Sequence, residues 1–475
     1  MGFPDHKTKI IATIGPASET EETLRKMIAA GMNIARLNFS HGDFESHKRM
    51  IKNIRSAAQA ANSRVAIMAD LPGPKIRIGV FKEEPIFLNA GDMFTLTVEP
   101  VEGSVERASV SFPLLPASVH IGDTVFLNDG LIELRVHSIS GSNVNFNVIV
   151  GGELRSRKGL NLPNVDLGIS AFTDNDRTWL KFAIEQGVDA ISQSFVNRAT
   201  DILSVRSAAE SLGASPFIIA KIERATAIEH FAEILEAADG IMIARGDLGV
   251  ETPLEEIAIL QKKLIQITRQ AGKPVITATQ MLESMTESRR PTRAEATDVA
   301  NAILDGSDCV MLSEESADGS FPVQAVSMLA RIAAKVEPYI SAAKQLEETD
   351  GAASSTSDLR ELVSMSVRTA VLKAHPAVVV IPTRSGISAR SVARYRLPVW
   401  VAAVSPLETT CQYLMFSYGV YPIYYRDHPQ DWTQYIRDLV SSQQLSGDIV
   451  ILTEGPSVEH PSTTHRMEII NVRHH

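Results

Sequence analysis

The sequence predicts an α/β protein: a (β/α)8 TIM barrel with a small β-barrel lid domain inserted in it and an α/β domain after it. Eight short apolar runs, each ending in a polar residue, predict the barrel strands, and segments of helical period lie between most of them. Buried parallel strands have continuous apolar runs, and their alternation with helices implies crossover connections. The runs are KIIATIG, NIARLNFS, VAIMADL, VDAISQSF, FIIAKIE, GIMIARGDLG, PVITATQ and CVMLSEES. An open doubly wound sheet is the structural alternative.

A change of pattern between the third and fourth runs marks the inserted domain. Four segments there, DMFTLTVE, DTVFLND, LIELRVHSIS and NVNFNVIVGG, alternate apolar and polar residues with turn residues between them. This predicts an antiparallel β domain over residues 71–168 in a loop at the catalytic face of the barrel, where it can act as a lid that excludes water. The barrel then takes residues 1–70 and 169–345.

A polar stretch of small residues, EETDGAASSTSD at 347–358, predicts a linker. The runs AVVVIP, VWVAAVS, GVYPIYY, DIVILTEG and MEIINV follow it and alternate with helical segments. They predict a separate α/β domain over 355–475 with a largely parallel sheet.

Three helix starts have the capping-box pattern, in which a hydroxyl residue is followed three positions later by Glu. The pairs are Ser18 with Glu21, Thr252 with Glu255, and Thr292 with Glu295.

Composition excludes some classes of function. The net charge is −10 without a long basic run, which argues against nucleic acid as a partner. No apolar run approaches the ~18 residues of a membrane span, so no membrane is expected. Cys309 and Cys411 lie in apolar sequence, which predicts buried reduced thiols. The first residues lack a signal pattern, so we expect a cytoplasmic protein.

Most of the apolar runs have polar residues at or near their C-terminal ends. They are Arg36, Asn38 and Ser40 in the second run, Asp70 in the third, Lys221 and Glu223 in the fifth, Arg245, Gly246 and Asp247 in the sixth, Thr279 in the seventh, and Ser313, Glu314 and Glu315 in the eighth. In a (β/α)8 barrel these positions surround one mouth, where active sites lie.

The fifth and sixth runs point to a particular chemistry. Lys221 and Glu223 are two apart on a strand, so both side chains leave on the same face, inward. A structural ion pair is the alternative, because a buried lysine needs a partner. Together with Asp247, they suit phosphoryl transfer: two carboxylates for Mg²⁺ or Mn²⁺ and one fixed positive charge.

Several long motifs resemble those of the pyruvate kinase family. They are RLNFSHG at 36–42, KGLNLPNVDL at 158–167, KIE at 221–223, ARGDLGVE at 244–251, ATQMLESM at 278–285 and RPTRAEATDVANAILDGSD at 290–308. The resemblance implies a glycolytic enzyme that converts phosphoenolpyruvate and ADP to pyruvate and ATP, and a homotetramer.

Site residues follow from the resemblance by position. It implies that Lys221 stabilises the transferred phosphoryl group and the enolate, and that Glu223 and Asp247 bind the metal. Gly246 and Thr279 would hold the carboxylate of pyruvate, and Thr279 would help to protonate the enolate. The resemblance also implies that Arg36 contacts phosphate. The residues that it implies contact the nucleotide are Asn38, Phe39, Ser40, His41, Arg77 and Lys158. For His41, a capping or packing role is the alternative.

This chain departs from the family at the monovalent-cation site. Many members that need K⁺ have Thr and Glu where this chain has Leu71 and Lys75. A lysine ammonium can stand in for K⁺ near the phosphate. We therefore expect activity without K⁺.

The last domain contains PTRSGISARSVARYR, which resembles the family's effector-phosphate loop. The residues concerned are Thr383, Arg384, Ser385, Gly386 and Ser388. A serine-rich turn with an N-cap is the alternative. The later segment TEGPSVEHPSTTHRMEI lacks the family's glycine-rich loop and places Glu454 and Glu459 where a second phosphate would lie. A sugar monophosphate is therefore expected as the effector in place of fructose 1,6-bisphosphate.

Three other functions remain open. A metal-dependent aldolase or lyase acting on pyruvate enolate also uses a barrel, carboxylates and a divalent ion, but needs no lid or nucleotide contacts. A pyruvate phosphate dikinase-type reaction would need a phosphohistidine or ATP-grasp region, and neither is evident. A non-catalytic paralogue that binds sugar phosphates would have no reason to keep Lys221, Glu223, Asp247 and Thr279 together.

Overall fold

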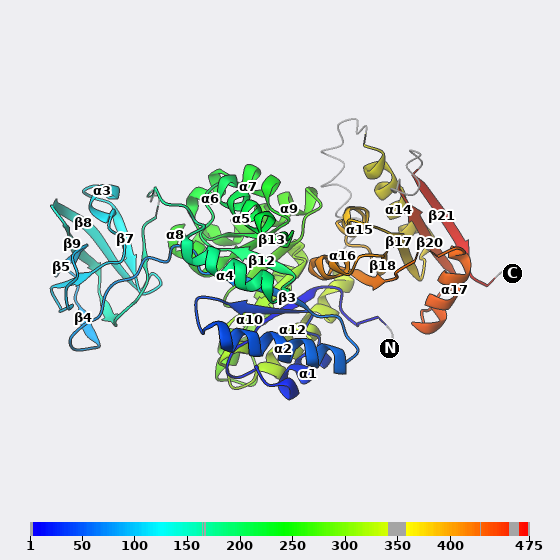
Figure 1. Ribbon diagram of the computed structural model, residues 1–475, viewed down its shortest axis with the longest axis horizontal. Helices are drawn as coiled ribbons and strands as arrows, with labels where there is room; N and C mark the ends of the chain where they lie inside the picture. The colour runs from blue at the N-terminus through cyan, green and yellow to red at the C-terminus, as the bar shows by residue number, and fades with distance from the viewer. Residues whose placement is uncertain are drawn as a thin grey trace.

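The computed structural model describes residues 3–163, 165, 168–340, 358–427, 429–455 and 465–473. Three bodies lie in a row, with the lid at one end, the barrel in the middle and the C-terminal domain at the other end (Figure 1). The predicted linker at 347–358, except for its last residue Asp358, lies outside the described residues, and so do the predicted bounds at 345 and 355.

The eight apolar runs form a closed parallel barrel, as predicted, in the order β1-β16-β15-β14-β13-β12-β3-β2. Its strands are β1 (Lys9–Thr13), β2 (Ile34–Asn38), β3 (Ala66–Leu71), β12 (Ala190–Gln193), β13 (Phe217–Ile222), β14 (Gly240–Ala244), β15 (Val275–Ala278) and β16 (Cys309–Leu312). The ring closes where β1 pairs with β16, with Lys9 opposite Cys309.

Helices surround the barrel and pack on its outward-facing side chains. They are α1 (Glu21–Ala29), α2 (Phe44–Ala60), α4 (Asp174–Glu185), α5 (Ala199–Ser211), α6 (Ala225–Glu229), α7 (Phe231–Ala237), α8 (Arg245–Glu251), α9 (Ile257–Gln270), α10 (Arg293–Asp305), α11 (Glu314–Ala317) and α12 (Pro322–Val336). A second apolar cluster fills the barrel interior, and Phe416 from the C-terminal domain joins it. The two clusters follow from the alternation of side chains along each strand.

One of the three predicted capping boxes is confirmed, and two are wrong. Thr292 and Glu295 cap α10. The start of α1 is capped by Thr20, and the Ser18 hydroxyl instead accepts from the backbone N–H of Gly15. Thr252 closes α8: its hydroxyl donates to the carbonyl oxygen of Leu248.

The lid lies between β3 and α4 and has its own apolar core. It consists of β4 (Ile86–Leu88), β5 (Met93–Thr97), β6 (Arg107–Ser109), α3 (Leu115–Ser118), β7 (Thr124–Leu127), β8 (Ile132–Ser140), β9 (Asn143–Val150), β10 (Gly152–Leu154) and β11 (Leu160–Asn161). The main sheet has the order β11-β7-β8-β9-β5-β6, and β5 pairs with β6 in parallel, so the sheet is mixed. β3 runs to Leu71, so the barrel includes the first residue that the sequence assigned to the lid.

The C-terminal domain has a five-stranded sheet in the order β19-β18-β17-β20-β21, parallel except for β21. Its elements are α14 (Leu359–Ala374), β17 (Val378–Pro382), α15 (Ile387–Ala393), β18 (Val401–Ser405), α16 (Glu408–Tyr413), β19 (Val420–Tyr424), α17 (Trp432–Ser442), β20 (Ile449–Glu454) and β21 (Arg466–Asn471). All five predicted strands are present. No helix in the described part of the chain is long and apolar enough to cross a membrane.

Candidate active site

The inward-facing positions of five barrel strands change from apolar to polar near their C-terminal ends. The apolar positions in the barrel interior are Ile11, Ile34, Met68, Ala190 and Ile219. Two residues later in the same strands stand Thr13, Arg36, Asp70, Ser192 and Lys221, all buried. Side chains two apart on a strand share a face, so these five form one polar layer at the barrel mouth.

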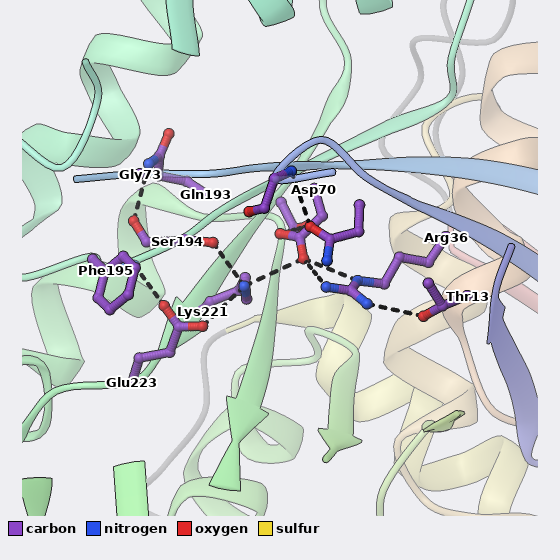
Figure 2. A network of polar contacts seen from close by, with 12 residues as sticks. Thr13, Arg36, Asp70, Gly73, Gln193, Ser194, Phe195, Lys221 and Glu223 are labelled. Carbon is purple, nitrogen blue, oxygen red and sulfur yellow. Dashed lines mark hydrogen bonds and ion pairs between the residues drawn. The ribbon is translucent and has the colours of Figure 1, made fainter. Parts of the chain in front are cut away.

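Asp70 lies at the centre of this layer (Figure 2). Its Oδ2 accepts from Arg36 Nε at 2.9 Å and Nη2 at 2.5 Å, and it lies 3.3 Å from Lys221 Nζ. Its Oδ1 accepts from the Ser192 hydroxyl at 2.7 Å, and Arg36 Nη1 donates to Thr13 Oγ1 at 2.9 Å. Burial alone would raise the pKa of the Asp70 carboxyl, but Lys221 and Arg36 together hold that pKa below its ordinary value. Asp70 is therefore an ionised counter-ion shared by two cations.

Lys221 points between Asp70, Ser194 and Glu223 (Figure 2). Its Nζ donates to Ser194 Oγ at 2.7 Å and lies 2.9 Å from Glu223 Oε1. Burial lowers the pKa of Lys221, but the charges of Asp70 and Glu223 outweigh burial and raise this pKa above its ordinary value. The side chain is thus a fixed positive charge and not a neutral base.

Glu223 and Asp247 form the candidate metal site. Glu223 is 2% exposed, and its Oε2 accepts from the backbone N–H of Phe195 at 2.7 Å. Burial raises the pKa of Glu223, Lys221 lowers it, and the nearby charge of Asp247 raises it further. A divalent cation would relieve this repulsion, and two carboxylates with further oxygens from substrate or water suit Mg²⁺. Among the described residues no three His, Cys, Asp or Glu side chains could hold a metal on their own.

Thr279 follows β15 and is held in a strained backbone conformation. Its φ is 72°, which is uncommon for a β-branched residue and typical of functional sites. Arg245 Nη2 donates to the Thr279 carbonyl oxygen at 2.9 Å and also pairs with Asp298 at 2.7 Å. A Cβ on Gly246 would lie only 2.7 Å from Thr279 Cγ2, so the approach of α8 to this loop requires glycine.

Asp247 and Thr279 face a cleft of about 1570 Å³ between barrel and lid. Asp247, Thr279 and Lys75 line the cleft together with lid residues such as Asp129. Lys75 is exposed there, whereas Leu71 is fully buried.

The residues predicted to contact the nucleotide lie in two places. Asn38 ends β2, and the exposed Ser40 and His41 follow it in a turn. The side chain of Phe39 is 2% exposed and stacks on Trp179 with ring centroids 4.5 Å apart, so only its backbone can reach a ligand.

Arg77 and Lys158 lie on the two segments that join the lid to the barrel. Arg77 forms a β-bridge with Gly159, and its Nη1 donates to the Arg157 carbonyl oxygen at 2.9 Å. Lys158 is half-buried beside this bridge.

The predicted effector residues form one loop between β17 and α15. The Thr383 hydroxyl accepts from the backbone N–H of Gly386 at 3.0 Å, and the Arg384 carbonyl oxygen accepts from Thr410 Oγ1 at 2.6 Å. The side chains of Arg384 and Ser385 are exposed, and Ser388 lies in the first turn of α15.

Sequence reasoning did not identify Thr13, Ser192 and Ser194 as part of the site. A usable signal existed for Thr13 and Ser192, because each stands two residues after an inward apolar position. Ser194 follows the end of β12 and had no such signal.

Two family models match the chain: pyruvate kinase, barrel domain, over residues 5–326, and pyruvate kinase, alpha/beta domain, over residues 361–470. A pyruvate kinase of Thermococcus litoralis is 46% identical over 99% of this chain and 100% of its own length. One of Geobacillus stearothermophilus is 41% identical over 98% of this chain and 80% of its own. The crystal structure of a pyruvate kinase from Cryptosporidium parvum superposes with a TM-score of 0.92 at 36% identity, over 98% of this chain and 96% of that one. With both domains matched and these relatives covered over 80–100% of their own length, this chain belongs to the pyruvate kinase family.

Proposed function

We propose that this chain transfers the phosphoryl group of phosphoenolpyruvate to ADP, giving pyruvate and ATP, as a glycolytic enzyme. One observation carries the proposal: Lys221 is buried and charged between Asp70 and Glu223, at a barrel mouth that faces the lid. Fixed positive charge aimed at the migrating group is the main demand of phosphoryl transfer.

In this reaction the bond between the phosphorus and the enol oxygen of phosphoenolpyruvate breaks, and a terminal oxygen of ADP bonds to phosphorus. Lys221 and Arg36 hold the phosphoryl group and stabilise the enolate left behind. The backbone at Gly246 and the Thr279 hydroxyl hold the carboxylate, and a proton delivered beside Thr279 to the terminal carbon completes pyruvate.

A divalent ion, Mg²⁺ or Mn²⁺, fits Glu223 and Asp247, because both carboxylates are hard oxygen ligands that repel one another. When bound, it would neutralise charge on the phosphate and enolate oxygens. Glu223 keeps its orientation through the N–H of Phe195.

A coupled assay for pyruvate, with and without ADP and with and without Mg²⁺, tests the function. We expect pyruvate only when both are present. Pyruvate formed without ADP would favour the lyase, and silence would favour the non-catalytic paralogue. Lys221→Met should lower kcat by about 10²-fold or more, by analogy with loss of one oxyanion-hole donor. Lys181→Met, which removes an exposed lysine of α4, is the matched control.

Independence from K⁺ is the second part of the proposal. The Lys75 ammonium is exposed in the active-site cleft and has no hydrogen bond or ion pair among the described residues, so it is available to a phosphate. Leu71 offers no side-chain oxygen to a cation. We expect full activity with only a bulky organic cation present, and dependence on K⁺ in Lys75→Glu. A large activation of the unmodified chain by K⁺ would refute this.

Regulation by a sugar monophosphate through the loop at 383–388 is the third part. The exposed Arg384 and Ser385 are the groups available to one phosphate. Glu454 pairs with Arg466 at 3.2 Å, which places an acidic group near the end of β20, while Glu459 lies outside the described residues. Titrating a hexose monophosphate and fructose 1,6-bisphosphate at subsaturating phosphoenolpyruvate distinguishes the two effectors, and activation by the bisphosphate alone would refute this part.

The homotetramer also stays a proposal, supported by family membership. Sedimentation velocity of the full chain measures it, and a monomer at micromolar concentration would contradict it.

A further inference from the structure

Two buried charged residues beside the candidate metal site have no part in the proposed reaction. Arg224 directly follows Glu223, and Glu251 stands four residues after Asp247, one helical turn along α8. Arg224 is 4% exposed and Glu251 is 7% exposed. Each of the two residues therefore lies close along the backbone to one of the two carboxylates proposed to bind the metal.

Arg224 reaches from the barrel to the lid. Its Nη2 donates to the carbonyl oxygen of Val165 at 3.0 Å and lies 3.4 Å from that of Leu162. Leu162 and Val165 are buried in the apolar core of the lid. The guanidinium thus binds the segment by which the chain leaves the lid.

Glu251 completes the link on the other side. Its Oε2 lies 3.8 Å from Arg224 Nε, which is close enough for an ion pair but too far for a hydrogen bond. An arginine fork can satisfy a carboxylate with two parallel bonds, but here it is divided between a carboxylate and lid carbonyls. Movement of the lid segment must therefore move the guanidinium relative to Glu251.

We propose that Arg224 and Glu251 are positioning residues that couple the lid to the metal carboxylates. This inference rests on the proposed function, because it takes Glu223 and Asp247 as the metal ligands. When the lid moves, Arg224 carries the change to the ends of β13 and α8, from which these carboxylates project. Metal binding must then also change the exposure of the lid segment, because coupling between two sites is reciprocal.

Hydrogen exchange of the free enzyme with and without Mn²⁺ tests the coupling, and electron paramagnetic resonance measures Mn²⁺ binding separately. In the unmodified chain we expect Mn²⁺ to slow exchange in peptides covering residues 158–163 by about threefold or more. Arg224→Gln should still bind Mn²⁺ but lose this slowing, since a neutral amide cannot hold carbonyls and carboxylate together. Arg224→Lys should keep part of it, because an ammonium keeps the charge without the fork.

Arg206→Gln is the matched control, because Arg206 also binds a carbonyl and a carboxylate, those of Ala237 and Asp239, away from the lid. It should keep the full slowing. In turnover, Arg224→Gln should lower kcat about tenfold or more, while the KM for phosphoenolpyruvate changes less than about twofold.

The inference is overturned if Arg224→Gln keeps the Mn²⁺-dependent slowing, or if Arg206→Gln loses it equally. If Arg224→Gln does not fold, the measurement on Arg224→Lys decides, and full slowing there overturns it. A chain that binds Mn²⁺ but forms no pyruvate would refute the proposed function and leave this test intact. A chain that binds no Mn²⁺ would overturn both.

Discussion

Asp70 is the one acidic side chain among the five residues of the polar layer. It is the shared counter-ion of Arg36 and Lys221, and its Oδ1 is held by Ser192. Removing one member of a buried charge cluster leaves the others uncompensated, which costs more than the cluster contributes as a whole. The positions of both cations thus depend on one carboxylate.

Asp70→Asn should lower kcat/KM by about 10²-fold at pH 7, because both cations lose their common partner. It should also change the pH profile. Burial lowers the pKa of Lys221 and Asp70 raises it, so the pKa falls in the variant and protonated Lys221 is lost at lower pH. The alkaline decline of activity therefore begins earlier than in the unmodified chain. A profile from pH 6 to 10 measures this, with Asp174→Asn, an exposed carboxylate of α4, as the control.

At the scale of elements, the site depends on how closely α8 approaches the loop after β15. A Cβ on Gly246 would meet Thr279 Cγ2 at 2.7 Å, but would lie 3.7 Å from Thr279 Oγ1. The conflict is thus with the methyl group of Thr279 and not with the hydroxyl group, to which we assign a role in the proposed reaction.

Gly246→Ala should therefore lower kcat/KM about tenfold or more by displacing Thr279. Thr279→Ser removes the methyl group and keeps the hydroxyl group, so the double variant Gly246→Ala/Thr279→Ser should regain much of the activity. Steady-state kinetics of the four proteins give the coupling between the two positions. Simple additivity of the two changes would show that the clash is not the cause.

The helices and strands were more predictable from the sequence than the side-chain contacts between them. Continuous apolar runs identified all eight barrel strands, and the spacing of Lys221 and Glu223 placed both correctly at the mouth. The Ser192–Asp70 contact depends on the register of β12 against β3, which is set by tertiary packing and leaves no local pattern. The capping-box pattern also failed twice, because a four-residue pattern does not show at which residue the helix begins.

At the scale of the whole molecule, a buried lysine joins the barrel to the C-terminal domain. Lys9 lies in β1, and its Nζ donates to the Val420 carbonyl oxygen of β19 at 2.7 Å and lies 5.1 Å from the ring centroid of Trp400. Burial lowers the pKa of Lys9 to about 8, although Glu337 and Asp308 raise it. Because the lysine pKa in an unfolded chain is about 10.4, this residue favours the unfolded state below pH 8.

Lys9→Met should stabilise the protein at pH 7. The lowered pKa corresponds to a cost of about 3 kcal/mol, and the lost hydrogen bond offsets about 1–1.5 kcal/mol, which leaves a gain of ~1–2 kcal/mol. Between pH 8 and 10 the unfolded chain binds a proton that the folded chain does not, so the free energy of unfolding of the unmodified protein rises and the gain disappears. Thermal melts at pH 7, 8.5 and 10 measure this, with Lys181→Met as the control. A gain that is unchanged at pH 10 would contradict the assignment.

The pairing of β1 with β16 also constrains when the protein can fold. Lys9 and Cys309 are opposite one another in the closed ring, so the first strand lacks one neighbour until the ribosome has made the last. At ~5–20 residues per second, the intervening chain takes roughly 15–60 s to synthesise. The lid, whose strands are near one another in the chain, can form during that wait. The nascent barrel meanwhile keeps an unpaired strand edge open to wrong partners.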